Sequence, residues 1–211
     1  SDEPLYAHYL HRTGLDHPGA AEIIASQSTE WGSLTAALVG APPAQTPVWY
    51  QKHMAHHLLP GFDVSWVESL TNCFLIRDPE EVVSSYTRTR GSATLEDLGY
   101  PQQYALFERL RSRTNISPLV IDARDVLLDP ERMLTILCTY VGVEMSEAML
   151  EWPAGRRDSD GVWGPHWYTN VCRSTGFAPY RPKVIEYDQR FQAVVDQARP
   201  LYRAMWKYRV R

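Results

Sequence analysis

The sequence predicts a three-layer α/β fold in which a mainly parallel sheet is flanked by helices. Short apolar runs typical of buried strands occur at residues 74–76 and 119–121. Each run is followed by an Asp-Pro pair, which suits the start of a helix. Strands that alternate with helices in this way are typical of parallel sheets. The chain of 211 residues is long enough for one domain of this kind.

The first half of the chain contains two candidate strands. Residues 48–50 are β-branched and aromatic and follow a proline-rich stretch, which favours a strand. Residues 64–70 indicate a short helix that leads into the second strand, at 74–76. We expect that second strand to be covered on both faces, because a continuous apolar run is typical of a strand inside a parallel sheet.

Arg77 lies where this strand ends and the next helix begins. Asp78 is a good N-cap residue, and Pro79 suits the first helical position. We therefore expect Arg77 at the carboxyl edge of the sheet, where open α/β folds bind ligands. The guanidinium of Arg77 offers a rigid fork of donors, and Ser85 adds a hydroxyl group. Together they suit a phosphate.

The second half continues the alternation. Residues 95–113 have apolar residues at helical spacing, interrupted near Pro101. After the strand at 119–121, the Asp-Pro pair at 129–130 starts a helix for which Gly142 is a plausible stop.

The last part of the chain begins with a long loop. Residues 151–181 are rich in Gly, Pro, Trp and Arg, and loops of this length are usually functional or disordered. The aromatic residues argue against disorder. A final helix follows at about 189–206, with a bend expected near Pro200.

Composition excludes several classes of protein. The net charge of −4 argues against a nucleic-acid-binding protein, which would usually be basic. No apolar run approaches the length needed to cross a membrane. The three cysteines show neither zinc nor redox spacing, so a reducing, cytoplasmic location fits best.

The segment from Cys73 to Tyr86 resembles the 3′-phosphate-binding motif of sulfotransferases that use 3′-phosphoadenosine 5′-phosphosulfate (PAPS). Arg77 and Ser85 match the spacing of eight residues in that motif. The resemblance to bacterial members of this family implies a P-loop-like fold and a nucleotide-binding enzyme. An ordinary surface arginine and a helix serine in any βα unit would give the same local pattern.

A late loop resembles the segment that closes over the 3′-phosphate in the same family. Arg156 and Arg157 match its basic pair, and Gly161 and Trp163 match its Gly-x-Trp. Asp158 replaces a glycine often found after the basic pair, so the backbone there departs from the family pattern. The alternative is a surface loop with two solvated arginines. The resemblance implies that these four matching residues contact the nucleotide.

The segment around Lys52 resembles the place where many sulfotransferases carry a catalytic histidine. His53 takes that place, although the family's usual Lys-x-His is here Lys-His, so His56 or His57 could serve instead. Glu3 matches the carboxylate base of some bacterial members. Lys52 is expected to neutralise charge on the leaving phosphate. The base therefore stays open between a histidine and Glu3.

The histidines also have a metal-binding interpretation. If the stretch is helical, His53 and His57 share a face and could hold a metal ion. No glutamate lies between them as in a zinc protease, and sulfuryl transfer from PAPS needs no metal. We expect no metal site.

The family's 5′-phosphosulfate loop has no counterpart in this chain. That loop follows the first strand, and the resemblance implies that it precedes Ser1 or has been lost. We therefore expect residues 1–211 to be a single sulfotransferase-like domain that lacks its N-terminal strand and that loop.

The combined prediction is a cytoplasmic enzyme that moves the sulfuryl group from PAPS to a hydroxyl or amine of a small-molecule acceptor. We expect neither a nucleic-acid nor a membrane partner, and a homodimer is left open. The alternatives are a non-catalytic nucleotide-binding protein of the same fold and a P-loop small-molecule kinase. The kinase would need a Walker loop and Mg²⁺ ligands, neither of which is visible in this sequence.

Overall fold

The computed structural model describes residues 1–43, 46–113, 117–182 and 185–211. The chain divides into two compact units, each built from two separate stretches of sequence. Unit 1 comprises residues 1–70 and 153–175, and unit 2 comprises residues 71–152 and 176–211. Each unit is described by itself, and the single domain expected from the sequence stays a prediction.

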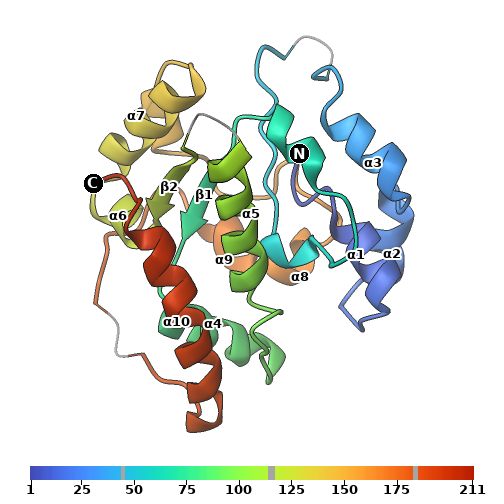
Figure 1. Cartoon of the computed structure of the whole chain (residues 1–211). Coiled ribbons are helices and arrows are strands. Elements are labelled where there is room, and N and C mark those ends of the chain that lie inside the picture. Colours follow the sequence, from blue (N-terminus) through green and yellow to red (C-terminus); the bar gives the residue numbers. More distant parts are fainter. Residues whose placement is uncertain (44–45, 114–116, 183–184) are drawn as a thin grey trace. The chain divides into compact units, whose positions relative to one another are not determined.

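Unit 2 contains the sheet. Strands β1 (Cys73–Ile76) and β2 (Leu119–Asp122) pair in parallel (Figure 1). In this register Phe74 lies opposite Val120. Two helices connect these strands, α4 (Pro79–Arg90) and α5 (Tyr100–Arg113). The predicted α/β class with a parallel sheet flanked by helices is therefore confirmed.

The start of α4 follows its local sequence signals. The Asp78 carboxylate accepts a hydrogen bond of 2.9 Å from the backbone N–H of Glu80, and Pro79 occupies the first helical position. The helix ends at Gly91, whose φ of 71° is readily adopted only by glycine. Arg77 therefore follows directly after β1, at the carboxyl edge of the sheet, as predicted.

One face of the sheet packs against α5 and the C-terminal helix α10 (Gln192–Trp206), which the short helix η4 (Gln189–Phe191) precedes. Phe74 points to this face, and its ring meets the ring of Phe107 on α5 edge-on at 5.7 Å. Both side chains are buried. The predicted final helix is confirmed, and Pro200 lies inside it.

The opposite face is covered over β2. The short helix α6 (Ala123–Leu128) leads to α7 (Pro130–Val141), and Met133 of α7 packs with Leu119 and Ile121 of β2. A third short helix, η3 (Glu147–Met149), follows. The Asp-Pro start and the Gly142 end of α7 are both as predicted.

Two predictions about unit 2 were wrong in detail. The strand at 74–76 is covered on one face rather than two, since Leu75 is 62% exposed while Ile76 is 1% exposed. The reason is that α7 packs over β2 and leaves the same face of β1 open. The helical pattern at 95–113 is helix only from Tyr100 onwards, so residues 95–99 form a turn and Pro101 lies in the first turn of α5, where a proline is well tolerated.

Unit 1 is built mainly from helices. They are α1 (Tyr6–Thr13), α2 (Ala20–Ser26), α3 (Trp31–Leu38), η1 (Ala55–His57), η2 (Ser65–Ser69), α8 (Gly164–Trp167) and α9 (Thr169–Arg173). Tyr6, Tyr9 and Leu10 of α1 pack with Ile23 of α2 and with Trp163. The predicted short helix at 64–70 is confirmed as η2.

Two further sequence predictions differ from the structure of unit 1. Residues 48–50 form no strand, and the chain instead makes a single parallel bridge two residues later, between Lys52 and Asp2. A strand needs a neighbour that is paired along its length, and the contacts of residues 48–50 with Ser1 are isolated hydrogen bonds. The long loop predicted at 151–181 contains two short helices, α8 and α9. Within the described part of the chain, no helix has the length and apolar character to cross a membrane.

Candidate active site

The backbone brings the N-terminal segment alongside Lys52. The N–H of Glu3 donates to the carbonyl of Lys52 at 2.9 Å, and the N–H of Lys52 donates to the carbonyl of Ser1 at 2.9 Å. Adjacent side chains of an extended segment normally point in opposite directions. Glu3 has a φ of 41°, rare for a residue other than glycine, and the kink lets both Asp2 and Glu3 reach the same ammonium group.

Lys52 is fully engaged in this cluster. Its Nζ donates to Glu3 Oε1 at 2.6 Å, to Tyr168 Oη at 3.0 Å and to Asp2 Oδ1 at 3.1 Å. An ammonium group has three protons, so each has an acceptor. Burial is the largest single influence and lowers the pKa of Lys52, but the charges of Glu3 and Asp2 and the hydrogen bonds to Glu3 and Tyr168 together outweigh it, so this pKa is raised. Lys52 is therefore a fixed cation.

Glu3 has three properties that suit a general base, which are burial, a raised pKa and one oxygen without a partner in the described part of the chain. Its side chain is only 12% exposed, and burial raises its pKa. The Lys52 ammonium offsets part of that rise, while the negative charge of Asp2 adds to it. Oε1 faces Lys52, whereas Oε2 has no hydrogen-bond partner among the described residues and is not sealed from solvent. Such a carboxylate can accept a proton from a bound substrate.

Tyr168 completes the cluster from the other stretch of unit 1. Its hydroxyl lies 2.5 Å from Asp2 Oδ2, and it accepts a hydrogen bond of 3.2 Å from Trp163 Nε1. Burial, together with the hydrogen bond to Asp2, raises the pKa of Tyr168 to about 12. Sequence reasoning gave neither Asp2 nor Tyr168 a role. The acidic pair Asp2-Glu3 was a visible signal, but Tyr168 lies 116 residues beyond Lys52 and no local pattern marks it.

His53 is less suited to act as the base. Burial lowers its pKa to about 4, so it is neutral and only weakly basic near pH 7. Its Nε2 lies 3.2 Å from Gln51 Oε1, and its Nδ1 is buried without a partner among the described residues. The structure therefore favours Glu3 over His53.

The other two histidines pack into the core of unit 1. The His57 ring is 1% exposed and stacks on Tyr6 at 4.8 Å, and its burial lowers its pKa well below the usual value. His56 contacts the edge of Tyr9 at 5.3 Å. Within the part of the chain that the structure describes, no group of three histidine, cysteine or acidic side chains is arranged to hold a metal ion.

The late loop combines an exposed turn with a buried anchor. Arg156 and Arg157 are exposed, and Asp160 closes the turn by accepting from the N–H of Arg157 at 2.9 Å. Trp163 is 2% exposed and packs edge-on against Tyr6, at 5.4 Å. A Cβ on Gly161 would lie 2.2 Å from the Trp163 ring, so only glycine fits there.

The buried Trp163 ring has no open face on which an adenine could stack, and Gly161 gives this ring the space that it occupies. Both residues therefore shape the loop. Nucleotide contacts stay predictions for Gly161 and Trp163, as they do for Arg156 and Arg157.

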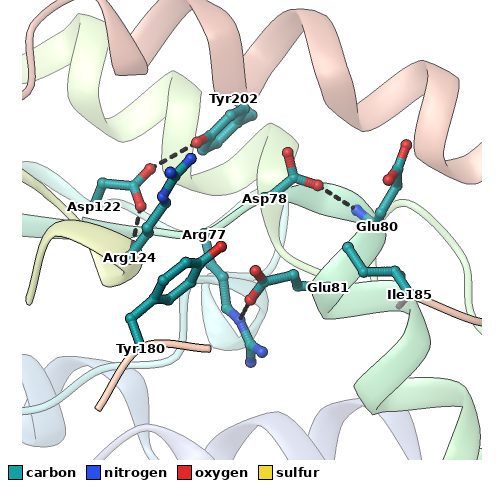
Figure 2. A pocket seen from close by; sticks show the side chains of 9 residues that line it. All are labelled: Arg77, Asp78, Glu80, Glu81, Asp122, Arg124, Tyr180, Ile185 and Tyr202. Atoms are coloured by element: carbon teal, nitrogen blue, oxygen red, sulfur yellow. Dashed lines mark hydrogen bonds and ion pairs between the residues drawn. The ribbon is translucent and has the colours of Figure 1, made fainter. Parts of the chain in front are cut away.

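The second candidate site is a pocket of about 180 Å³ in unit 2, at the carboxyl ends of β1 and β2 (Figure 2). Its lining is charged and aromatic, and consists of Arg77, Asp78, Glu80, Glu81, Asp122, Arg124, Tyr180, Ile185 and Tyr202. Arg77 lies in this pocket, with its Nε 2.8 Å from Glu81 Oε2. Ser85 is exposed on α4 and is not part of the lining, and the described contacts include none between Arg77 and Ser85.

The charges of this pocket are largely paired with one another. Arg199 forms ion pairs with Asp78, at 3.6 Å, and with Glu80. The buried Asp122 accepts from Tyr202 at 2.6 Å, and burial raises its pKa. Arg124 lies over the Tyr180 ring at 5.1 Å and has no ion pair within the described ranges.

An anion in this pocket could therefore bind Arg124, which has no ion pair within the described ranges, and the terminal nitrogens of Arg77, whose Nε is held by Glu81.

Unit 1 holds a carboxylate paired with a cation, and unit 2 holds arginines at the carboxyl ends of two parallel strands. The chain belongs to the sulfotransferase domain family, which it matches over residues 1–209.

Relatives of known sequence and structure were also found. The chain is 28% identical over 206 residues to branched-chain-amino-acid aminotransferase-like protein 2 of Arabidopsis thaliana, and 29% identical over 201 residues to protein 1 of the same name. These alignments cover 95% of this chain but 35% and 36% of the relatives, so the chain spans about a third of their length. The sulfotransferase domain from the curacin biosynthetic pathway superposes with a TM-score of 0.44 and 14% identity, over 92% of this chain and 77% of that one.

Proposed function

We propose that the chain is the catalytic domain of a sulfotransferase that moves the sulfuryl group of PAPS to a hydroxyl or amine of a small-molecule acceptor. Membership of the sulfotransferase domain family, which spans residues 1–209, is the observation that carries this proposal. The arrangement around Glu3 supports it further, since it offers a base with an open oxygen beside a fixed cation.

In the proposed reaction the acceptor oxygen or nitrogen attacks sulfur as the bond from sulfur to the leaving phosphate oxygen breaks. The acceptor's proton passes to Glu3 Oε2, and 3′-phosphoadenosine 5′-phosphate (PAP) leaves with the electron pair of the broken bond. Catalysis of this kind depends on positioning and on stabilisation of charge. Glu3 suits the base role better than His53 because its pKa is raised whereas that of His53 is lowered to about 4.

Lys52 takes a different part from the one expected from the sequence. All three of its protons already have acceptors, so it has none to offer a leaving phosphate without breaking a contact. We assign it the task of holding Glu3 in place and keeping that carboxylate ionised at neutral pH.

We assign the 3′-phosphate of the donor to Arg77, with Ser85, Arg156 and Arg157 as further contacts. Arginine suits this task because its planar fork can bind two phosphate oxygens at once. Arg77 is 39% exposed and its ion pair with Glu81 is a surface pair, which can be exchanged at little cost in free energy.

The names of the Arabidopsis relatives raise an aminotransferase as another activity. Pyridoxal-dependent aminotransferases need a lysine that gives up its proton to form a Schiff base. Lys52 is poorly suited to this, because Glu3, Asp2 and Tyr168 hold it as an ammonium ion. Sulfuryl transfer therefore remains the function that the site supports best.

The test is a calorimetric titration of the intact protein with PAP, with ATP as the matched control, followed by transfer of ³⁵S from labelled PAPS to a panel of hydroxyl and amine acceptors. Micromolar PAP binding with much weaker ATP binding, and label transfer, are expected. Binding without transfer to any acceptor would favour the non-catalytic alternative, and stronger binding of ATP would favour the kinase.

A further inference from the structure

We propose that Tyr168 is a positioning residue for Glu3, and that Tyr168, Asp2 and Lys52 together leave Glu3 Oε2 as the one oxygen that accepts the proton of the acceptor. The inference rests on the proposed role of Glu3 as the base. It extends that role to Tyr168 and Asp2, which come from opposite ends of unit 1 in sequence.

The direction of the Tyr168 hydrogen bond follows from its neighbours. The Tyr168 oxygen accepts hydrogen bonds from Lys52 Nζ at 3.0 Å and from Trp163 Nε1 at 3.2 Å, and both of these groups can only donate. Its own proton must therefore go to a carboxylate. Asp2 Oδ2 lies at 2.5 Å and Glu3 Oε1 at 3.4 Å, so Asp2 receives it.

Because Tyr168 donates to Asp2, only one carboxylate oxygen of Glu3 is engaged by a strong hydrogen bond within the described ranges. With both Asp2 oxygens engaged, one by Tyr168 and one by Lys52, Asp2 acts as a fixed negative charge. Glu3 Oε1 is held by Lys52 at 2.6 Å. Of the four carboxylate oxygens, only Glu3 Oε2 is without a partner among the described residues.

Tyr168 itself is held in place by the loop before it. Its N–H donates to the carbonyl of Gly164 at 2.8 Å at the end of α8, and its hydroxyl is fixed by the buried Trp163. The space for the Trp163 ring depends on Gly161. A rigid support of this kind keeps a catalytic group within the narrow range of geometry that the reaction needs.

The two neighbours of Glu3 act on its proton affinity in opposite directions. Burial is the largest influence and raises the pKa of Glu3, and Lys52 lowers it. The charge of Asp2 raises this pKa. The hydrogen bond that Tyr168 donates to Asp2 partly neutralises that charge, so the Tyr168 hydroxyl lowers the pKa of Glu3. Tyr168→Phe should therefore raise the pKa of Glu3, and Asp2→Asn should lower it.

The experiment measures this pKa directly and then through catalysis. The side-chain carboxyl of Glu3 is followed by ¹³C NMR across a pH titration in the intact protein, and its signal is identified by its loss in Glu3→Gln. The variants are Tyr168→Phe and Asp2→Asn. Tyr140→Phe is the matched control, because it also removes one tyrosine hydroxyl that donates a hydrogen bond, to the carbonyl of Asn72 at 3.0 Å.

The Glu3 titration should move to higher pH in Tyr168→Phe, to lower pH in Asp2→Asn, and not at all in Tyr140→Phe. The acid limb of the kcat profile should move in the same directions. In Tyr168→Phe, kcat should fall about tenfold with an unchanged KM for PAPS, the factor expected for one hydrogen bond to a charged group.

Titrations of Glu3 that coincide in all three variants would overturn the proposal, as would shifts in the same direction for Tyr168→Phe and Asp2→Asn. The NMR result does not depend on turnover. A protein that shows the opposite shifts but transfers no sulfuryl group would retain the network and refute the proposed function, so the two failures are distinguishable.

Discussion

The cluster around Glu3 in unit 1 and the pocket around Arg77 in unit 2 hold their charges in different ways. In unit 1, Lys52 donates to three acceptors, and its side chain is 40% exposed while that of Glu3 is 12% exposed. In unit 2, Arg77 is 39% exposed and forms one ion pair with Glu81, which lies in the first turn of α4. The two cations are almost equally open to solvent, so the number of partners distinguishes them. A single exposed pair contributes about 0–1 kcal/mol and is easily exchanged, whereas three acceptors hold an ammonium group in one position. The first arrangement suits chemistry that needs fixed geometry, and the second suits a ligand that must enter and leave.

The sharpest test of the fixed cluster is Glu3→Gln. The amide preserves shape but cannot accept the proton, so kcat should fall about 10²- to 10⁴-fold, the range for loss of a general base. PAP affinity, measured by calorimetry, should be unchanged. The companion variant His53→Gln should retain most activity, because a histidine with a pKa of about 4 is a weak base. A larger fall in kcat in His53→Gln than in Glu3→Gln would show that His53 is the base.

The second test uses acid, which acts on the histidines of unit 1. All seven histidines of the chain lie in residues 1–70 and 153–175. Burial lowers the pKa of His53 to about 4 and lowers that of His57 as well, so in acid the unfolded chain binds protons that the folded chain does not.

The sign of the effect follows from this difference. The free energy of unfolding keeps its full value above pH 6.5. It decreases as the pH falls towards 4, by up to about 1.4 kcal/mol per pH unit for each histidine. Urea unfolding followed between pH 7 and 4.5 measures this slope. His53→Asn should reduce it, and an identical slope in that variant would show that His53 is not held neutral by burial.

A third test addresses the arginine of the exchangeable pocket. Arg77→Ala should weaken PAP binding by about 1.5–3 kcal/mol, since a phosphate loses a charge-assisted hydrogen bond. Calorimetry measures the change. Arg88→Ala is the control because Arg88 is exposed on α4, the helix that follows Arg77, and is not part of the pocket. Equal affinities in the two variants would remove Arg77 from the nucleotide site.

The smallest expected effect comes from releasing Arg77. Glu81→Gln removes the carboxylate that holds its Nε at 2.8 Å, so PAP should bind more tightly, by at most about 1 kcal/mol. The folded state should lose no more than a similar amount, which thermal unfolding can check. Weaker PAP binding in this variant would mean that Glu81 helps to orient Arg77 rather than competing with the ligand.

Local signals in the sequence predicted much of unit 2. An aspartate cap, a proline in the first turn and a glycine at the end define α4 and α7, and each acts within a few residues of itself. The position of Arg77 followed from the same signals. The strand expected at 48–50 failed because pairing depends on a distant partner, which no local pattern reveals.

The site in unit 1 could be predicted only in part. Glu3, Lys52 and His53 were all candidates, but their ranking depends on burial, which separates the pKa of Glu3 from that of His53. Tyr168 was not singled out, since its role arises from contacts with residues far away in sequence. Trp163 matched a family pattern, and only the structure shows that its ring is enclosed.

The division of unit 1 into two stretches of sequence has a consequence for how the chain is made. Asp2, Glu3 and Lys52 leave the ribosome early, but Tyr168 follows Lys52 by 116 residues. Both strands of the sheet and the helices α4 to α7 emerge in between. Contacts between such distant residues form slowly, and domains fold as their sequence becomes complete. We therefore expect the contacts of Asp2 and Lys52 with Tyr168 to be among the last to form in a newly made chain, after the sheet has assembled.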